Sequence, residues 1–177
     1  MPIIYCTKKL ANFINRDGLS PIQPETPSPL GEWNGHLFTI NRKKCLVFVN
    51  NRSWYSVFIT DISKKDLADF NQLFLSRVVQ QMIHDLHLTN KELAVLENHF
   101  GPVRLASTNN DKKTLGIIND LVYTFKVHCQ IKYGALDYLP LIHENEIMND
   151  TIRNTSKGYT HLFRPIDAMK NLMKQLL

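Results

Sequence analysis

Three runs of β-branched and aromatic residues follow one another in the first third of the chain, and they limit its possible folds more than any other feature. They are His36-Leu37-Phe38-Thr39-Ile40, Cys45-Leu46-Val47-Phe48-Val49 and Trp54-Tyr55-Ser56-Val57-Phe58-Ile59. Such residues favour strands, and a short polar cluster separates each run from the next. We therefore predict an antiparallel meander over residues 33–59, with turns at 41–44 and 50–53.

The predicted meander is apolar on both faces. In the register that places Ile40 opposite Cys45 and Val49 opposite Trp54, alternate residues share a face. One face then carries Phe38, Ile40, Cys45, Val47, Val49, Trp54 and Phe58, and the other carries Leu37, Leu46, Phe48, Tyr55 and Val57. Since neither face is polar enough to meet water, we expect both to be covered.

Apolar residues at three- to four-residue steps predict two long helices after the meander, over about residues 63–88 and 112–133. A shorter helix at 89–99 lies between them and begins with the capping box Thr89-Asn90-Lys91-Glu92. Further helices are expected after Thr7, after Pro140 and from Pro165. Residues 103–105 are a candidate strand, and residues 159–163 alternate like an edge strand.

These elements predict an α+β fold: a small, mainly antiparallel N-terminal sheet packed against two long helices, with a helical C-terminal extension. We expect a single domain over residues 1–177. It would consist of a Pro-rich surface connector at 20–30, the meander at 33–59, a helical layer at 63–133 and the extension at 140–177.

Composition favours a globular protein of the cytoplasm. Of 177 residues, 44% are hydrophobic and 21% are charged, which excludes a wholly disordered or fibrous chain. No apolar stretch approaches the roughly 18 residues that cross a bilayer, and the first residues lack the pattern of a secretory signal. The three cysteines, Cys6, Cys45 and Cys129, have no CxxC spacing, as expected of reduced thiols in a cytoplasm.

The cationic side chains that we single out lie in the predicted turns and in the first helix. The candidate nucleic-acid-binding residues are Arg42, Lys43 and Lys44 at one hairpin tip, Arg52 and Trp54 at the next, and Lys8 and Lys9. Cations beside aromatic rings suit phosphate contacts and base stacking, and the net charge of +5 is compatible with a polyanion.

In the alternative interpretation, the charged tips prevent edge aggregation and the aromatic rings fill the core. The two tips also lie at opposite ends of the central strand, about 17–20 Å apart by ordinary strand dimensions. That separation argues against one compact patch.

Motifs for catalysis and cofactor binding are absent from the sequence. There is no GxxxxGK(S/T), no GxGxxG and no HExxH. The run His143-Glu144-Asn145-Glu146 is typical of a solvated first turn of a helix. We therefore expect no catalytic residue, no metal and no cofactor.

Histidine and cysteine offer two further alternatives. His84 and His87 lie one helical turn apart and could share a metal with Cys45 or His99, but the helical pattern puts both histidines on or near its polar arc. Cys45 could be a nucleophile with His36 as its base, yet the predicted register places this cysteine among apolar core residues.

Two segments resemble a family of bacterial domains of unknown function. The opening Ile4-Tyr5-Cys6-Thr7-Lys8-Lys9-Leu10 matches the "CTKKL" start of that family. Residues 30–50 match its Trp, its "LTIxRRK" hairpin and its apolar strand ending in Asn, so that the likeness spans about residues 4–60. The resemblance implies a bacterial cytoplasmic protein, sometimes joined to domains of plasmids or transposable elements, and so favours mobile-element or phage biology. It implies no activity.

Three functions are open at this point. The first is a non-catalytic bacterial or phage/mobile-element binding module that contacts nucleic acid or a nucleic-acid-associated protein. The second is an inhibitor or antitoxin-like partner of another protein, using the Pro-rich segment or the terminal helix. The third is a small metal-independent, toxin-like ribonuclease, with His36 or His161 as acid or base and Arg42, Lys44 or Arg52 stabilising a phosphate transition state. No membrane partner is expected, and the oligomeric state is open.

Overall fold

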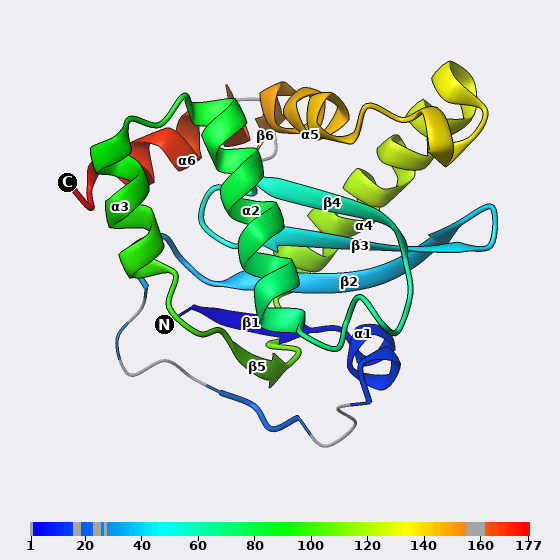
Figure 1. Ribbon diagram of the computed structural model, residues 1–177, viewed down its shortest axis with the longest axis horizontal. Helices are drawn as coiled ribbons and strands as arrows, with labels where there is room; N and C mark the ends of the chain where they lie inside the picture. Colours follow the sequence, from blue (N-terminus) through cyan, green and yellow to red (C-terminus); the bar gives the residue numbers. More distant parts are fainter. Residues whose placement is uncertain (1, 16–18, 23–25, 27, 155–161) are drawn as a thin grey trace.

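Five strands form one sheet in the order β4-β3-β2-β1-β5 (Figure 1). The computed structural model describes residues 2–15, 19–22, 26, 28–154 and 162–177. The strands are β1 (Ile3–Cys6), β2 (Trp33–Ile40), β3 (Lys43–Asn50), β4 (Ser56–Ile62) and β5 (Arg104–Ser107). The predicted meander is confirmed as β2, β3 and β4, whereas β1 runs parallel to both of its neighbours, β2 and β5.

The register of the meander differs from the predicted one by two residues in each hairpin. Phe38, and not Ile40, lies opposite Cys45, because the first turn is only Asn41-Arg42. Both turn residues have positive φ, 47° and 66°, as in the two-residue turns whose twist matches that of the strands. In the second hairpin Val49 lies opposite Ser56, and not Trp54. A shift of two residues preserves the face of every side chain.

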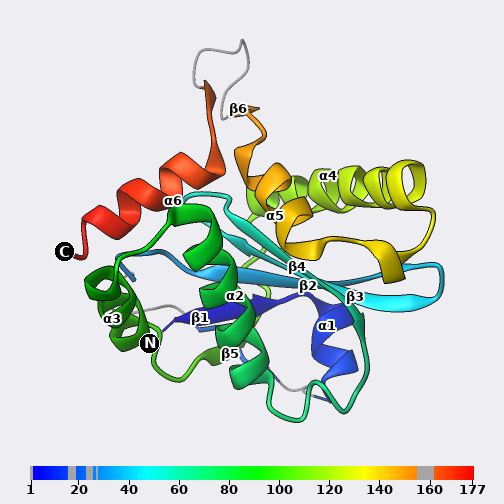
Figure 2. The same ribbon diagram turned by 45° about the horizontal axis from the view of Figure 1, so that its top comes forward.

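Both faces of the sheet are covered, as expected. α4 (Lys112–His128) lies across one face and α2 (Phe70–Leu86) across the other (Figures 1 and 2). The residues predicted to share the face with Cys45 form one core with α4, and those predicted to share the face with Phe48 belong to the other core. Phe58 stacks on Phe125 of α4 with ring centroids 4.1 Å apart, so the sheet–helix contact is close-packed.

Of the first four helices, three begin near the predicted places and one begins later. α1 (Lys8–Phe13) follows Thr7, α3 (Asn90–His99) has the predicted capping box, and α4 begins at the predicted residue. α2 begins at Phe70 rather than near Ser63. The Asp66 carboxylate accepts hydrogen bonds from the Ser63 backbone N–H and hydroxyl, which closes a local turn before the helix.

The C-terminal part is helical, as predicted. A π-helical turn, η1 (Cys129–Tyr133), extends α4, and a 3-10 turn, η2 (Leu136–Tyr138), leads to α5 (Leu141–Asp150) and then α6 (Pro165–Lys174). Between the last two helices, β6 (Arg153–Asn154) pairs with β7 (Leu162–Phe163). Of the strand expected at 159–163, positions 159–161 lie outside the described residues. None of the described helices is long and apolar enough to span a membrane.

Candidate functional site

The tip of the first hairpin holds one exposed cation and one paired cation. Arg42 is exposed in the turn. The Lys43 ammonium lies 2.8 Å from Asp61 Oδ2 and 2.6 Å from Asp137 Oδ1. The hydrogen bonds that Lys43 donates to these carboxylates, above all the one to Asp137, hold the pKa of Lys43 above its usual value. Lys43 therefore joins β4 to η2 and is already neutralised, whereas Arg42 is not part of that ion pair.

Three further predicted cations lie near this hairpin, on its second strand and on α1. The Lys44 Nζ lies 5.2 Å from the ring centroid of Phe13 in α1. Lys8 and Lys9, in the first turn of α1, are exposed. α1 therefore brings the N-terminal lysines to the same end of the molecule as the hairpin, as Figures 1 and 2 show.

Arg52 and Trp54 lie at the other end of the eight-residue strand β3. The Arg52 guanidinium donates to the Pro29 carbonyl. Trp54 is only 5% exposed, and its ring packs on Phe163 with centroids 5.1 Å apart. The structure thus places Lys8, Lys9, Arg42 and Lys44 at one end of the molecule, and it leaves Arg52 and Trp54 apart from them. Trp54 fills the core, as in the alternative interpretation, so its ring is not presented to a base.

The structure adds His36, Thr7 and Lys126 to the predicted cations. His36 Nδ1 lies 3.2 Å from Thr7 Oγ1, and the Thr7 backbone N–H donates to the Gly35 carbonyl. The Lys126 Nζ, from α4, lies 5.9 Å from the ring centroid of Phe38. We call the group Lys8, Lys9, His36, Arg42, Lys44 and Lys126 the cationic end.

His36 is the half-buried centre of the cationic end. Burial lowers the pKa of His36, and the charges of Lys9 and Lys126 lower it further. The imidazole is therefore neutral at pH 7 while two ammonium groups act on it from different elements. Lys126 was not predicted from the sequence, because its proximity to His36 depends on how α4 crosses the sheet. The available signal was the pair Tyr123 and Lys126, an aromatic residue and a cation one turn apart.

Cys45 is a core residue and not a nucleophile. Its side chain is fully buried, and burial raises the pKa of its thiol, so the thiolate is disfavoured. Cys6 and Cys129 are buried as well.

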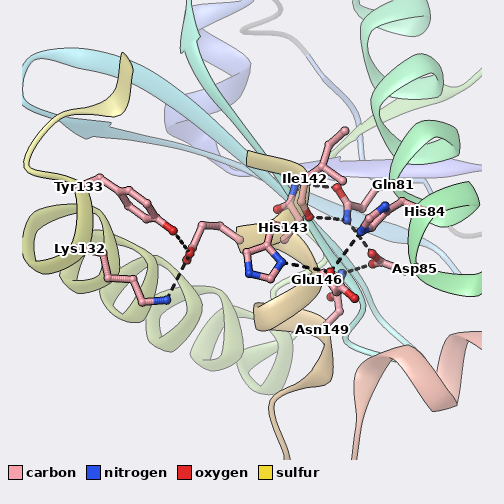
Figure 3. A network of polar contacts seen from close by, with 11 residues as sticks. Gln81, His84, Asp85, Lys132, Tyr133, Ile142, His143, Glu146 and Asn149 are labelled. Atoms are coloured by element: carbon pink, nitrogen blue, oxygen red, sulfur yellow. Dashed lines mark hydrogen bonds and ion pairs between the residues drawn. The ribbon is translucent and has the colours of Figure 1, made fainter. Parts of the chain in front are cut away.

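A second polar region joins α2 to α5 (Figure 3). The buried Asp85 carboxylate accepts hydrogen bonds from Tyr55 Oη at 2.6 Å, Gln81 Nε2 at 2.7 Å and Asn149 Nδ2 at 3.1 Å. Burial raises the pKa of Asp85, while these three hydrogen bonds oppose the shift. Each donor to Asp85 comes from protein, so the group serves as a fixed acceptor between β4, α2 and α5.

The same region closes one edge of the sheet. Asn149 Oδ1 accepts from the Ser56 backbone N–H at 2.7 Å, and its Nδ2 donates to the Ser56 carbonyl at 2.9 Å. Asn145 makes the same pair of bonds to Phe58, at 2.8 and 3.2 Å. Because an amide side chain carries one acceptor and a donor group, as a peptide does, α5 takes the place of a neighbouring strand at β4.

The histidine motifs singled out from the sequence are used in contacts of α5. Glu146 Oε2 lies 3.1 Å from His84 Nε2 and 3.3 Å from His143 Nδ1 (Figure 3). Both contacts lower the pKa of Glu146, and the contact with His84 has the larger effect. His87 is exposed at the end of α2, and His99 lies 3.1 Å from the Ser28 hydroxyl. Within the part of the chain that the structure describes, no group of three or more His, Cys, Asp or Glu side chains could hold a metal ion.

Glu144 joins α5 to the end of α4 and to η1. Its buried carboxylate accepts from Tyr133 Oη at 2.6 Å and contacts His128 Nδ1 at 3.1 Å and Lys132 Nζ at 3.4 Å. Burial raises the pKa of Glu144, but the hydrogen bonds from Tyr133 and His128 and the charge of Lys132 outweigh it, so the pKa lies below its usual value. The polar groups of α5 are thus occupied in holding helices and sheet together.

Fold and site together define an α+β protein with helices on both faces of a five-stranded sheet and a cluster of cations at one end. The chain belongs to the family described as a domain of unknown function, DUF6933, whose model matches residues 3–168. This confirms the resemblance to a family of unknown function and extends it well beyond residue 60. Comparison with curated proteins gave no match, and neither did comparison with solved structures.

Proposed function

We propose that this protein is a non-catalytic module that binds single-stranded nucleic acid at the cationic end, mainly through phosphate contacts. The observation that carries the proposal is the arrival of Lys9 from α1 and Lys126 from α4 around His36 of β2. Lys44 and Arg42 extend the same end along the hairpin. Lysine and arginine side chains are the groups that attract a phosphate backbone.

An exposed aromatic ring lies next to one of these cations. Tyr123 is 71% exposed and stands one helical turn before Lys126 on α4. A ring in this position suits stacking with an unpaired base, which duplexes do not offer. This is why the proposal specifies a single strand, and it gives Tyr123 the role that the sequence suggested for Trp54.

The ribonuclease alternative receives less support. Of the cations considered for it, Arg52 lies past the far end of β3, apart from Arg42 and Lys44. His161, the other candidate acid or base, lies outside the described residues.

A second candidate function is binding to a protein partner. Ile131 of η1 is 80% exposed and Tyr138 of η2 is 78% exposed. Exposed apolar side chains on adjacent elements favour a protein contact at this part of the surface.

The bacterial and cytoplasmic setting is part of the same proposal. Its supports are the "CTKKL" start and the three buried cysteines, all of them free thiols. We infer an origin in a mobile element or phage from the resemblance alone.

The test is fluorescence anisotropy of labelled single- and double-stranded DNA and RNA with the nuclease-free protein, over a series of salt concentrations. We expect binding to single strands that weakens steeply with salt and leaves the oligonucleotide intact on a gel. Lys44→Gln should reduce the slope of log K against log salt by about 0.7, the value for one lost contact with a single strand. Arg42→Gly should do the same without loss of stability, because φ of Arg42 is positive and suits glycine.

Two matched variants separate specific from general effects. Lys91→Gln removes the same charge from an exposed position on α3, away from the cationic end, and should leave the slope unchanged. Tyr123→Ala should weaken binding at every salt concentration without changing the slope, since stacking releases no counterions. Absence of binding at low salt would overturn the proposal in favour of a protein partner, and cleavage would favour the ribonuclease.

A further inference from the structure

We infer that His36, Lys9 and Lys126 form a phosphate-binding subsite within the cationic end, and that phosphate and a proton bind there together. This inference rests on the proposed function for its biological ligand, a phosphodiester of single-stranded nucleic acid. The subsite itself is defined by geometry, and its chemistry can be tested with phosphate alone.

The first part of the geometry is the attachment of α1 to β2. Thr7 is the residue before α1, and it bonds twice to neighbouring residues of β2: its N–H to the Gly35 carbonyl at 3.0 Å and its Oγ1 to His36 Nδ1 at 3.2 Å. Lys9 is two residues further along. The backbone of Lys9 is therefore held close to the imidazole by short contacts of Thr7, and not by a long loop.

The second part is the crossing of α4 over the same face of β2. His36 and Phe38 are two residues apart on one strand, so their side chains share the face that α4 covers. The Lys126 ammonium lies over the Phe38 ring, at 5.9 Å from its centroid. Lys9 and Lys126 thus act on one imidazole from two different helices, and among the described residues they are the charged groups found to shift its pKa.

The third part is the hydrogen-bonding state of the ring. When the Thr7 hydroxyl donates to Nδ1, the neutral imidazole carries its proton on Nε2. This N–H and the ammonium groups of Lys9 and Lys126 are donors that anionic oxygens accept from, and phosphate offers several such oxygens. Without an anion, the like charges of Lys9 and Lys126 and the burial of the ring all resist protonation of His36.

An anion bound in the subsite favours protonation of His36. Its negative charge offsets the two ammonium groups and favours the imidazolium, so the pKa of His36 must be higher in the complex than in the free protein. By linkage, phosphate affinity then rises as the pH falls through the raised pKa, and it levels off below the pKa of the free protein. The groups that face His36 and set this balance are Lys9 of α1 and Lys126 of α4, together with the Thr7 hydroxyl.

The experiment is an NMR titration of the imidazole signals in the whole protein, at constant ionic strength, without ligand, with inorganic phosphate and with a short single-stranded oligonucleotide. We expect both ligands to move the His36 signals and to raise the pKa of His36. His99 is the internal control: burial lowers its pKa as well, but it lies at the Ser28 hydroxyl, outside the cationic end. Its signals should not move.

Variants then test whether Lys126 and His36 contribute to oligonucleotide binding. Lys126→Gln should weaken oligonucleotide binding about fivefold at 0.1 M salt, the loss expected for one phosphate contact with a single strand, and Lys91→Gln should change it less than twofold. His36→Gln should leave binding at neutral pH nearly unchanged and abolish its increase at acidic pH. Chemical denaturation of each variant checks that it is folded.

The outcomes separate this inference from the proposed function. If the oligonucleotide binds but the His36 signals stay unchanged and Lys126→Gln behaves like Lys91→Gln, the subsite is refuted and the proposed function stands. If phosphate raises the pKa of His36 while no oligonucleotide binds, the subsite stands with a free phosphate ligand and the proposed function is overturned. If neither ligand moves the His36 signals and neither binds, both are overturned.

Discussion

Asp85 shows how this chain tolerates a carboxylate in its interior. The side chain is buried between β4, α2 and α5, and three neutral donors surround it. These hydrogen bonds, together with the nearby charge of His84, offset part of the cost of removing the carboxylate from water. Burial still raises the pKa of Asp85, which means that ionisation of this group works against folding.

Tyr55→Phe is expected to reduce stability by about 1–3 kcal/mol at neutral pH, because it removes the 2.6 Å hydrogen bond to the ionised carboxylate. That bond lowers the pKa of Asp85, so its loss raises the pKa further. A raised carboxyl pKa favours the folded state only while the group is protonated. The loss in the variant should therefore grow from about pH 4 to pH 7, as urea denaturation at each pH will show.

The exposed Tyr123 supplies the control for this change. Tyr123→Phe removes the same hydroxyl from a ring that is 71% exposed, and it should leave stability unchanged at either pH. A loss for Tyr55→Phe that is the same across the pH range would contradict the assignment, because it would mean that the ionisation of Asp85 does not depend on Tyr55.

At the scale of elements, α5 is defined by what its side chains replace. Asn145 and Asn149 stand one helical turn apart, and Ser56 and Phe58 stand two residues apart on β4, so the two repeats have nearly the same length. Each asparagine can therefore form hydrogen bonds with the backbone N–H and carbonyl of one residue of β4. The helix satisfies the backbone of β4 and blocks the addition of a further strand there.

Asn149→Ala should destabilise the protein by about 1–3 kcal/mol, since it leaves the N–H and the carbonyl of Ser56 without these partners in a buried position. Hydrogen exchange should show faster exchange of the Ser56 amide, and Asn145→Ala should do the same for Phe58. Asn119→Ala, on the exposed face of α4, is the matched control and should be neutral or slightly stabilising. Unchanged exchange at Ser56 in Asn149→Ala would show that the asparagine does not protect the strand.

The elements also show which parts of the structure a sequence can reveal. The faces of β2 and β3 were predictable because side-chain direction depends only on alternation, and the two-residue register error left it intact. The start of α2 was not, because the Ser63–Asp66 turn competes locally with the helix. The roles of Asn145 and Asn149 were missed, because the helical pattern of a sequence does not show that the helix will lie against the edge of a sheet.

The same limit applies to the candidate site. Lys8, Lys9, Arg42 and Lys44 were found because exposed cations in turns and short helices are visible in the sequence. His36 was considered only as a catalytic base, and Lys126 was not considered. Their relation depends on the crossing of α4 over β2, a contact between residues far apart in the chain, which local patterns do not encode.

At the scale of the whole molecule, a sheet separates two hydrophobic cores, and each core holds cysteine. Cys6 belongs to the core with α2, while Cys45 and Cys129 belong to the core with α4. Burial raises the pKa of Cys6 to about 12 and that of Cys129 to about 11, and it raises the pKa of Cys45 as well. The thiols thus lie on both sides of the sheet and report on both cores.

We expect the native protein to resist thiol alkylation at mildly alkaline pH and the denatured protein to react at all three cysteines. If the two cores open together, Cys6 and Cys45 should be modified at the same rate, and that rate should follow global unfolding in urea. Mass spectrometry of the alkylated peptides measures each site separately. Faster modification of Cys45 and Cys129 than of Cys6 would show instead that the layer of α4 opens independently.

The position of β1 has a consequence for synthesis of the chain. Ile4 lies opposite Trp33 of β2 on one side and opposite Leu105 of β5 on the other. At about 5–20 residues per second, a ribosome delivers Leu105 several seconds after Trp33. During that interval the nascent chain holds a nearly complete sheet with one side of β1 open to pairing with other chains. The four residues Arg104–Ser107 close it, so the period of greatest risk for a newly made molecule ends only when this short strand leaves the ribosome.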